Sequence, residues 1–145
     1  MFYIGFTTRP RTDNEGRPHA LGGIELGSDS GAFEVDLTVW SPQQYDDQWR
    51  AGVARIAAGA TSSALITSYR GDDAESHAIW AMWRVGTDII FAEQIVPGEL
   101  IPASDVTDAF YRAVGDRRST TDDGEPVSEW AVPFAQVLSF LAEDE

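Results

Sequence analysis

The chain has 145 residues, of which 43% are hydrophobic and 11% aromatic, and its 24 acidic residues against ten Arg and no Lys give a formal net charge of −14. This size and composition exclude a disordered chain and predict one domain over residues 1–145 with a core of its own. The absence of cysteine excludes disulfides, thiolate metal sites and a cysteine nucleophile. Because no apolar stretch is long enough for a signal peptide or a membrane helix, we expect a cytoplasmic protein with no membrane partner.

The negative charge also limits the choice of partners. Proteins bind nucleic acids mainly through Lys and Arg, so direct nucleic-acid binding is disfavoured. An acidic surface is often no more than a means to solubility. The alternative is a positively charged protein partner, for example a nuclease, which this chain would attract and bind quickly.

The first strands are predicted on either side of a polar, Pro-containing stretch over 7–20, which we expect to be a surface loop. Short strands are expected at 2–6 and 20–26. Alternating apolar and polar residues then predict a half-buried antiparallel strand over 32–40. The side chains expected on its buried face are Phe33, Val35, Leu37 and Val39.

A long helix is predicted directly after this strand. Ser41 is a favourable N-cap, Pro42 suits the first helical position, and Gly59 marks the end. One apolar stripe at three- and four-residue spacing should face a sheet. Its members are Tyr45, Trp49, Val53, Ile56 and Ala57.

Three further strands, at 63–69, 77–85 and 88–96, are separated by turn sequences and predict an antiparallel meander. The middle strand is apolar on both faces, which is typical of a central strand.

The C-terminal third predicts a short helix over 105–114, an exposed loop over 116–126, a strand over 127–132 and a helix that starts at Pro133. The apolar stripe expected on that last helix comprises Phe134, Val137, Leu138 and Leu141. The predicted fold class is therefore α+β, with a mainly antiparallel twisted sheet of about six to seven strands and three packed helices.

Catalytic and metal-binding patterns are weak. His19 and His77 are the only histidines, so a Ser-His-Asp hydrolase would need one of them beside a Ser and an Asp in space. Adjacent carboxylates such as Asp46 and Asp47 point apart on a helix or strand, and the acidic run that begins at Asp122 lacks the ligand spacing of an EF-hand. We expect no catalytic residues, no metal site and no cofactor.

The five tryptophans divide into two groups. Trp49 and Trp83 lie on predicted buried faces and should belong to the core. Trp40, Trp80 and Trp130 are less constrained, and one of them on an exposed face would serve as a partner-binding anchor or as a platform for stacked bases.

Several segments together resemble the immunity proteins of bacterial contact-dependent growth inhibition systems. The resemblance covers about residues 32–141. Its first half rests on Val35-Asp36-Leu37-Thr38-Val39-Trp40, the helical segment from Tyr45 to Trp49, Thr61-Ser62-Ser63-Ala64-Leu65 and Ile79-Trp80-Ala81-Met82-Trp83. The ending is similar to that of the Enterobacter type, through Arg118-Ser119-Thr120-Thr121-Asp122-Asp123-Gly124, Val127-Ser128-Glu129-Trp130 and Val137-Leu138-Ser139-Phe140.

The resemblance implies a fold similar to that of the Whirly single-stranded-DNA-binding proteins and no catalysis of its own. Proteins of this family bind and block the C-terminal toxin domain of a cognate effector, commonly a nuclease. A Whirly-like module that binds single-stranded nucleic acid is the alternative from another class, although the charge opposes it. A small hydrolase that uses His19 or His77 is the third.

Charge alone selects the surface that we expect to contact the toxin, because acidic residues in loops can vary without disturbing a core. The predicted contact residues are Asp72, Asp73, Glu75, Asp122, Asp123, Glu125 and Glu129. No protection of the sheet edges is evident in the sequence, so pairing of two copies remains open and we expect a monomer or a weak dimer.

Overall fold

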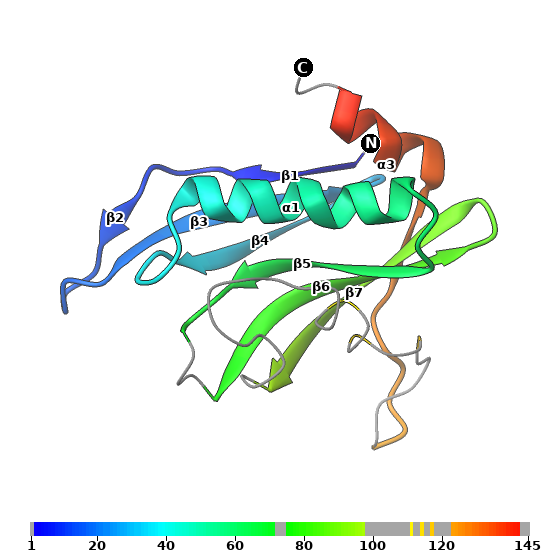
Figure 1. Ribbon diagram of the computed structural model, residues 1–145. Coiled ribbons are helices and arrows are strands. Elements are labelled where there is room, and N and C mark those ends of the chain that lie inside the picture. Colours follow the sequence, from blue (N-terminus) through cyan, green and yellow to red (C-terminus); the bar gives the residue numbers. More distant parts are fainter. Residues whose placement is uncertain are drawn as a thin grey trace.

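The computed structural model describes residues 2–71, 75–97, 111, 114, 117 and 123–142 (Figure 1). In these residues the fold is α+β, with eight antiparallel strands in two four-stranded sheets and two helices. Sheet A consists of β1 (Phe2–Phe6), β2 (Arg11–Thr12), β3 (Pro18–Leu26) and β4 (Asp29–Asp36). Sheet B consists of β5 (Ser62–Ser68), β6 (Ser76–Val85), β7 (Asp88–Pro97) and β8 (Trp130–Pro133). The helices are α1 (Pro42–Ala57) and α3 (Phe134–Ala142).

Sheet A is built around β3, which pairs with β1 and β2 along one edge and with β4 along the other. The β3–β4 hairpin turns at Gly27, whose φ of 72° lies in the left-handed region that glycine adopts without strain. Alternate residues face inward, as expected for strands with one solvated face. The inward side chains include Phe2, Ile4, Ile24, Phe33 and Val35.

Sheet B is the predicted meander, in the order β5-β6-β7-β8. β6 pairs with β5 and β7, so it is central, and its residues Ile79 to Trp83 are buried on both faces. One face packs on sheet A, where the rings of Phe2 and Phe91 stack with centroids 5.1 Å apart. A single cluster of buried apolar side chains therefore includes residues of both sheets.

The predicted start of α1 is confirmed. Ser41 accepts a hydrogen bond from the Gln44 backbone N–H, and the Gln44 side chain accepts one from the Ser41 N–H, which together form a capping box. The helix ends before Gly59, which has a φ of 105°. Four of the five predicted stripe residues, Tyr45, Trp49, Val53 and Ile56, are fully buried.

The α1 helix lies along the free edge of β5 and bonds to its backbone. Gln48 donates from Nε2 to the Ala64 carbonyl (2.9 Å) and accepts from the Ile66 N–H (2.6 Å), as a neighbouring strand would. Trp49 donates to the Ile66 carbonyl at 2.7 Å. Close approach depends on Gly52, since a Cβ there would lie 2.4 Å from the Ala64 carbonyl oxygen. The edge of β5 is thus protected, contrary to our expectation for the sheet edges.

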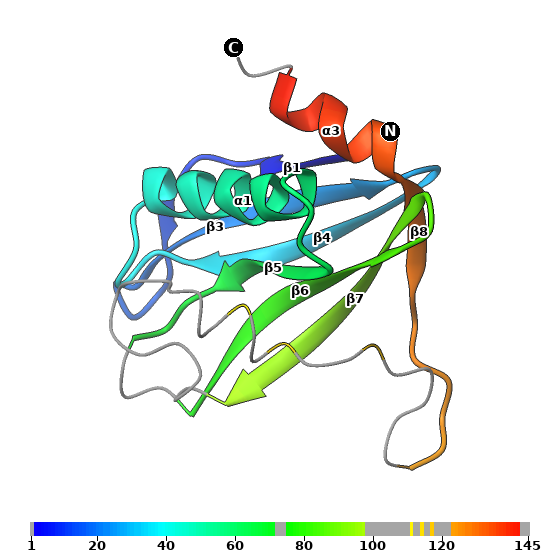
Figure 2. The same cartoon turned by 45° about the vertical axis from the view of Figure 1, so that its right-hand side comes forward.

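The α3 helix follows β8 and packs near β1 and α1 (Figure 2). Its Phe140 ring meets the Phe2 ring edge-on, with centroids 5.4 Å apart. The prediction for this helix was wrong at Leu138, which is 37% exposed, whereas Val137 and Phe140 form the buried face.

Three predictions for the strands need correction. The single sheet is two sheets, because α1 occupies the β5 edge on which a further strand would have to pair. The strand expected over 32–40 ends at Asp36, whose carboxylate accepts the Thr38 N–H, and Val39 is exposed. The loop expected over 7–20 contains β2 and the first residues of β3.

Two predicted segments lie largely outside the described residues. Of the helix expected over 105–114, only Tyr111 and Val114 are described, and both pack on the core. Of the loop expected over 116–126, Arg117 and residues 123–126 are described. Neither α1 nor α3 is long and apolar enough to cross a membrane.

The tryptophans are more buried than predicted. Trp49 and Trp83 are core residues as expected, but Trp40 and Trp80 are also buried, at 3% and 5% exposure. Trp130 is half-buried against Trp80, with ring centroids 5.4 Å apart. None of the five therefore offers a fully open ring for stacked bases.

Candidate functional site

One end of sheet B collects acidic residues from segments far apart in the sequence. Because the sheet is antiparallel, the last residues of β5 and β7 and the first residues of β6 lie together here. Residues 123–129 approach β8 from the same side (Figures 1 and 2). Of the predicted contact residues, Glu75, Asp123 and Glu125 are exposed there. Asp72, Asp73 and Asp122 lie outside the described residues.

Glu129 differs from the other predicted contact residues because it is held within the chain. Arg117 donates two hydrogen bonds to its carboxylate, from Nε at 2.7 Å and from Nη2 at 2.8 Å. The bond to Glu129 raises the pKa of Arg117. The pair neutralises one acidic and one basic charge at this end of the sheet, so the contribution of Glu129 to the local field is small.

Other arginines are engaged with aromatic rings. The guanidinium carbon of Arg84 lies 4.1 Å from the Phe134 ring centroid, and that of Arg55 lies 4.3 Å from the Tyr111 centroid. Arg50 lies 5.8 Å from the Phe140 centroid and donates to the Leu141 carbonyl. These contacts use arginine as a packing residue.

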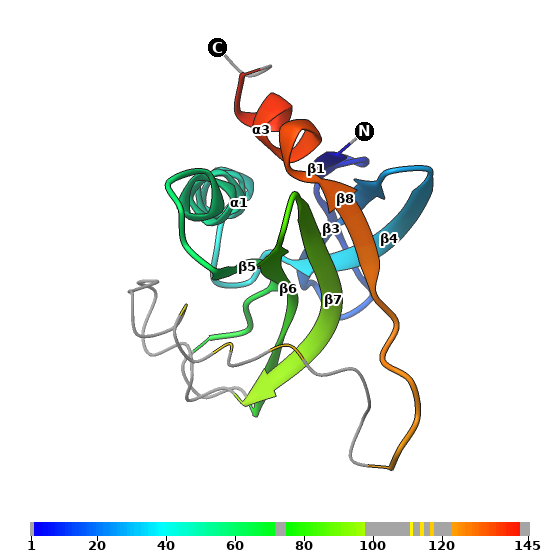
Figure 3. The ribbon, with the colours of Figure 1, turned by 90° about the vertical axis from the view of Figure 1, so that its right-hand side faces the viewer.

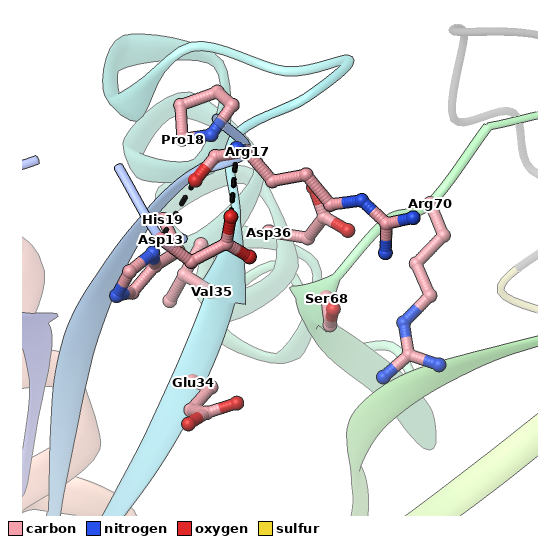
Figure 4. Close-up of a pocket in the computed structure, with 9 residues that line it drawn as sticks. All are labelled: Asp13, Arg17, Pro18, His19, Glu34, Val35, Asp36, Ser68 and Arg70. Atoms are coloured by element: carbon pink, nitrogen blue, oxygen red, sulfur yellow. Dashed lines mark hydrogen bonds between the residues drawn. The ribbon is translucent and has the colours of Figure 1, made fainter. Parts of the chain in front are cut away.

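A cavity of about 390 Å³ lies where the two sheets meet, between the start of β3, the end of β4 and the end of β5 (Figure 4). Its lining combines both signs of charge: Asp13, Arg17, Pro18, His19, Glu34, Val35, Asp36, Ser68 and Arg70. Figure 4 shows the guanidinium groups of Arg17 and Arg70 on one side and the Glu34 carboxylate on the other. No local sequence pattern indicated this cavity, because its residues are brought together only by packing of the two sheets.

The carboxylate of Asp13 organises the turn beside the cavity. It accepts the backbone N–H of Arg17 at 2.9 Å and that of Glu15 at 2.8 Å. The bond from Arg17 is the main reason that the pKa of Asp13 lies below its ordinary value. Arg17 also pairs with Glu15, whose oxygen lies 3.3 Å away, at the exposed surface.

The histidines do not form a catalytic relay with the described residues. His19 and Ser68 both line the cavity, but His19 Nδ1 lies 3.5 Å from the Arg17 carbonyl oxygen and makes no hydrogen bond with Ser68. His77 is buried, stacks on Tyr69 and accepts the Arg70 N–H on Nδ1. Within the described ranges, no group of three or more His, Asp or Glu side chains is arranged to hold a metal ion.

An exposed apolar residue that sequence reasoning missed lies on β7. Ile95 is 70% exposed, although it continues a strand whose Ile89, Ile90 and Phe91 are buried. A signal was present in the sequence, because Glu93 lies two residues before Ile95 and therefore faces the same side of the strand. A charged residue at that position indicates that this part of the face is open to solvent.

Comparison with known proteins shows which family the chain belongs to. No curated protein sequence matches the chain. One chain of the "CdiA-CT/CdiI toxin and immunity complex from Enterobacter cloacae" has the same fold, with a TM-score of 0.82 and 19% sequence identity, over 99% of this chain and 97% of the other. The model of the CdiI N-terminal domain family matches residues 35–140. This match spans most of the sequence, from β4 to α3, and the chain therefore belongs to the CdiI N-terminal domain family.

Proposed function

We propose that this protein is an immunity protein that binds the C-terminal toxin domain of a CdiA-type effector and neutralises it without catalysis of its own. The family match over residues 35–140 carries this conclusion. The likeness to a chain from a toxin and immunity complex supports it.

We further propose that the toxin is a basic protein, as a nuclease would be. The support is electrostatic, since the chain carries −14 and no Lys. Opposite charge would raise the association rate, so that the immunity protein captures the toxin soon after entry. Action on an incoming toxin would take place in the cytoplasm, which is where we expect the protein to reside.

For the contact surface we retain the loop carboxylates predicted from charge: Asp72, Asp73, Glu75, Asp122, Asp123, Glu125 and Glu129. Exposure of Glu75, Asp123 and Glu125 at one end of sheet B supports this choice. The bonds from Arg117 partly neutralise Glu129, which weakens the electrostatic case for Glu129 as a contact residue.

The test is protection of cells. The C-terminal domain of the CdiA-type protein encoded beside this gene is expressed under an inducible promoter, with and without the immunity protein, and growth is followed. We expect growth arrest without the chain and full rescue with it, together with a stable complex of the two purified proteins. Failure of the wild-type chain to rescue growth or to bind the domain would reject the proposed function.

The charge surface is tested by reversal. We expect Asp123→Arg with Glu125→Arg to slow association with the toxin domain by about tenfold, because both residues are exposed at the proposed surface. The matched control is Glu25→Arg with Asp29→Arg, which makes the same charge change on sheet A. Equal association rates for both double variants would reject this choice of surface.

The nucleic-acid-binding alternative and the Whirly-like arrangement remain predictions from the resemblance. The burial of Trp40 and Trp80 weakens the case for base stacking, and the net charge opposes contact with phosphates. A gel shift with single-stranded DNA at low salt decides between the two functions, since an immunity protein of this charge should leave the DNA unshifted.

A further inference from the structure

The end of sheet B near the exposed acidic residues Glu75, Asp123 and Glu125 also has a surface patch of three apolar side chains and one acidic side chain. We name it the β7 patch, and it consists of Trp80, Glu93, Ile95 and Trp130. These four side chains share one face of the sheet. Glu93 lies opposite Trp80, and Trp130 lies opposite Phe91, two residues before Glu93 on β7. Farther along this face Phe91 packs on Phe2 of sheet A, so the face passes from the core to solvent along β7.

Ile95 is the apolar centre of the patch. At 70% exposure it is the most open of the large hydrophobic side chains in the described residues, and Val85, at the other end of β6, follows at 45%. Its partner on β6 is Ala78, whose small side chain leaves Ile95 standing above the sheet. A large side chain of this kind, surrounded by polar groups, is typical of an anchor that fills a pocket on a partner.

Trp80 provides a second, independent sign of a partner. Its side chain is 95% buried, at 5% exposure, and its indole N–H has no acceptor among the described residues. Buried N–H groups are nearly always bonded in native proteins, so an orphaned one beneath a surface patch points to an acceptor supplied from outside. Trp130, half-buried over Trp80, is the side chain that a partner would displace.

The charges around the patch define the chemistry of the partner. Glu93 lies within it, and Glu75, Asp123 and Glu125 are exposed at the same end of the sheet. Arg117 is bonded to Glu129, the residue that directly precedes β8. An apolar contact with an acidic rim fits a protein surface that has a small hydrophobic pocket surrounded by Lys or Arg.

We infer that the toxin domain docks on the β7 patch, with Ile95 in a hydrophobic pocket, basic residues facing Glu93 and the acidic loops, and a backbone or side-chain oxygen that accepts the Trp80 N–H. This inference rests on the proposed function and adds the docking site and its anchor to it. The solvent-facing side of sheet A, whose strands β1, β3 and β4 are labelled in Figure 3, is less suitable because its large apolar side chains are less open. Tyr3 is 41% exposed and lies across Gly5, and Leu21 is 39% exposed.

The main test compares Ile95→Arg with Val85→Arg, using the purified C-terminal domain of the adjacent CdiA-type protein as the probe. Both changes place a positive charge on an exposed strand position, so both variants should fold, as circular dichroism will verify. We expect Ile95→Arg to weaken binding by about 100-fold or more and Ile95→Ala by about tenfold, because central anchors dominate interface energies. Val85→Arg should bind within about threefold of wild type.

Each arm can overturn the inference. If the wild-type chain binds the toxin domain and Ile95→Arg binds equally well, the docking site is wrong while the proposed function stands. If Leu21→Arg on sheet A weakens binding more than Ile95→Arg does, the toxin uses the other sheet. If the wild type itself does not bind, the proposed function fails instead.

The role of the indole is tested with Trp80→Phe, which removes the N–H and keeps a buried aromatic ring. We expect the free protein to melt somewhat lower than wild type, because the smaller ring fills less of the buried site, and we expect affinity for the toxin domain to fall by about five- to tenfold at temperatures where both proteins are folded. An affinity equal to that of wild type would show that Trp80 acts through packing alone, and that result would overturn the hydrogen bond from Trp80.

Discussion

Gln48 substitutes for a missing neighbour strand beside β5, and its amide is buried. Gln48→Leu keeps the size of the side chain but leaves the Ala64 carbonyl and the Ile66 N–H without their partner. We expect a loss of about 2–4 kcal/mol in the free energy of unfolding, measured by urea denaturation, because each orphaned buried group costs about 1–3 kcal/mol. The control is Gln43→Leu, since Gln43 bonds only to Asp47 at the exposed surface of α1. A control loss as large as that of Gln48→Leu would contradict the strand-like role of Gln48.

Gly52 is the second residue on which the approach of α1 to β5 depends. In an open helix Gly→Ala gains about 1 kcal/mol of helix propensity. Here the new Cβ would lie 2.4 Å from the Ala64 carbonyl oxygen, so the backbone must move. We expect Gly52→Ala to lower the melting temperature, with a net loss of about 1–2 kcal/mol from overpacking. Ala51→Gly, at an exposed neighbouring position, is the control and measures the effect of helix propensity alone. If Gly52→Ala stabilises the protein, the close packing of α1 on β5 at Gly52 is contradicted.

The elements followed from local signals wherever those signals were strong. The capping residues placed the start of α1 at Ser41, and the turn sequences placed β6 and β7 within one residue of their bounds. β4 ends at Asp36, earlier than the alternating pattern predicts, because its pairing with β3 stops there. Pro18 at the start of β3 has no backbone N–H to donate to β4, and the Asp36 carboxylate accepts the Thr38 N–H.

The features that depend on contacts between distant segments were not predictable. The division into two sheets depends on Gln48 meeting β5, 16 to 18 residues away. The cavity combines β3, β4 and β5, and the β7 patch combines β6, β7 and β8. Sequence reasoning did identify exposed acids at the end of sheet B, because loops and charge are local properties, but it could not identify the apolar centre beside them.

The turn that Asp13 holds at the start of β3 gives a pH-dependent prediction. Bonds from the Arg17 and Glu15 N–H groups lower the pKa of Asp13 below 3.8, so its contribution to stability is complete above that value. It is lost as the pH falls through the lower pKa of the folded state. We expect wild type to exceed Asp13→Asn in stability at pH 7, and we expect the difference to shrink toward pH 3 in urea titrations. A difference that grows on acidification would contradict this assignment.

At the scale of the whole molecule, the charge of −14 governs how the protein meets its partner. We expect the association rate with the toxin domain to fall by about 10–100-fold between about 50 and 500 mM NaCl, while the dissociation rate changes little. Stopped-flow or surface-binding kinetics at several salt concentrations measure both rates. The control variant is Ile95→Ala, which changes no charge and should therefore raise the dissociation rate but keep the salt dependence of association. An association rate that does not depend on salt would reject electrostatic attraction as the cause of fast binding.

The position of α1 along β5 has a consequence for the life of the protein before any toxin arrives. An immunity protein has to be present in its folded form before the toxin arrives. A bare strand edge would invite copies to stack into growing fibres at high concentration. With Gln48 and Trp49 occupying that edge, additional chains find no backbone template on β5, and the pool can be stored at high concentration without polymerising through this strand.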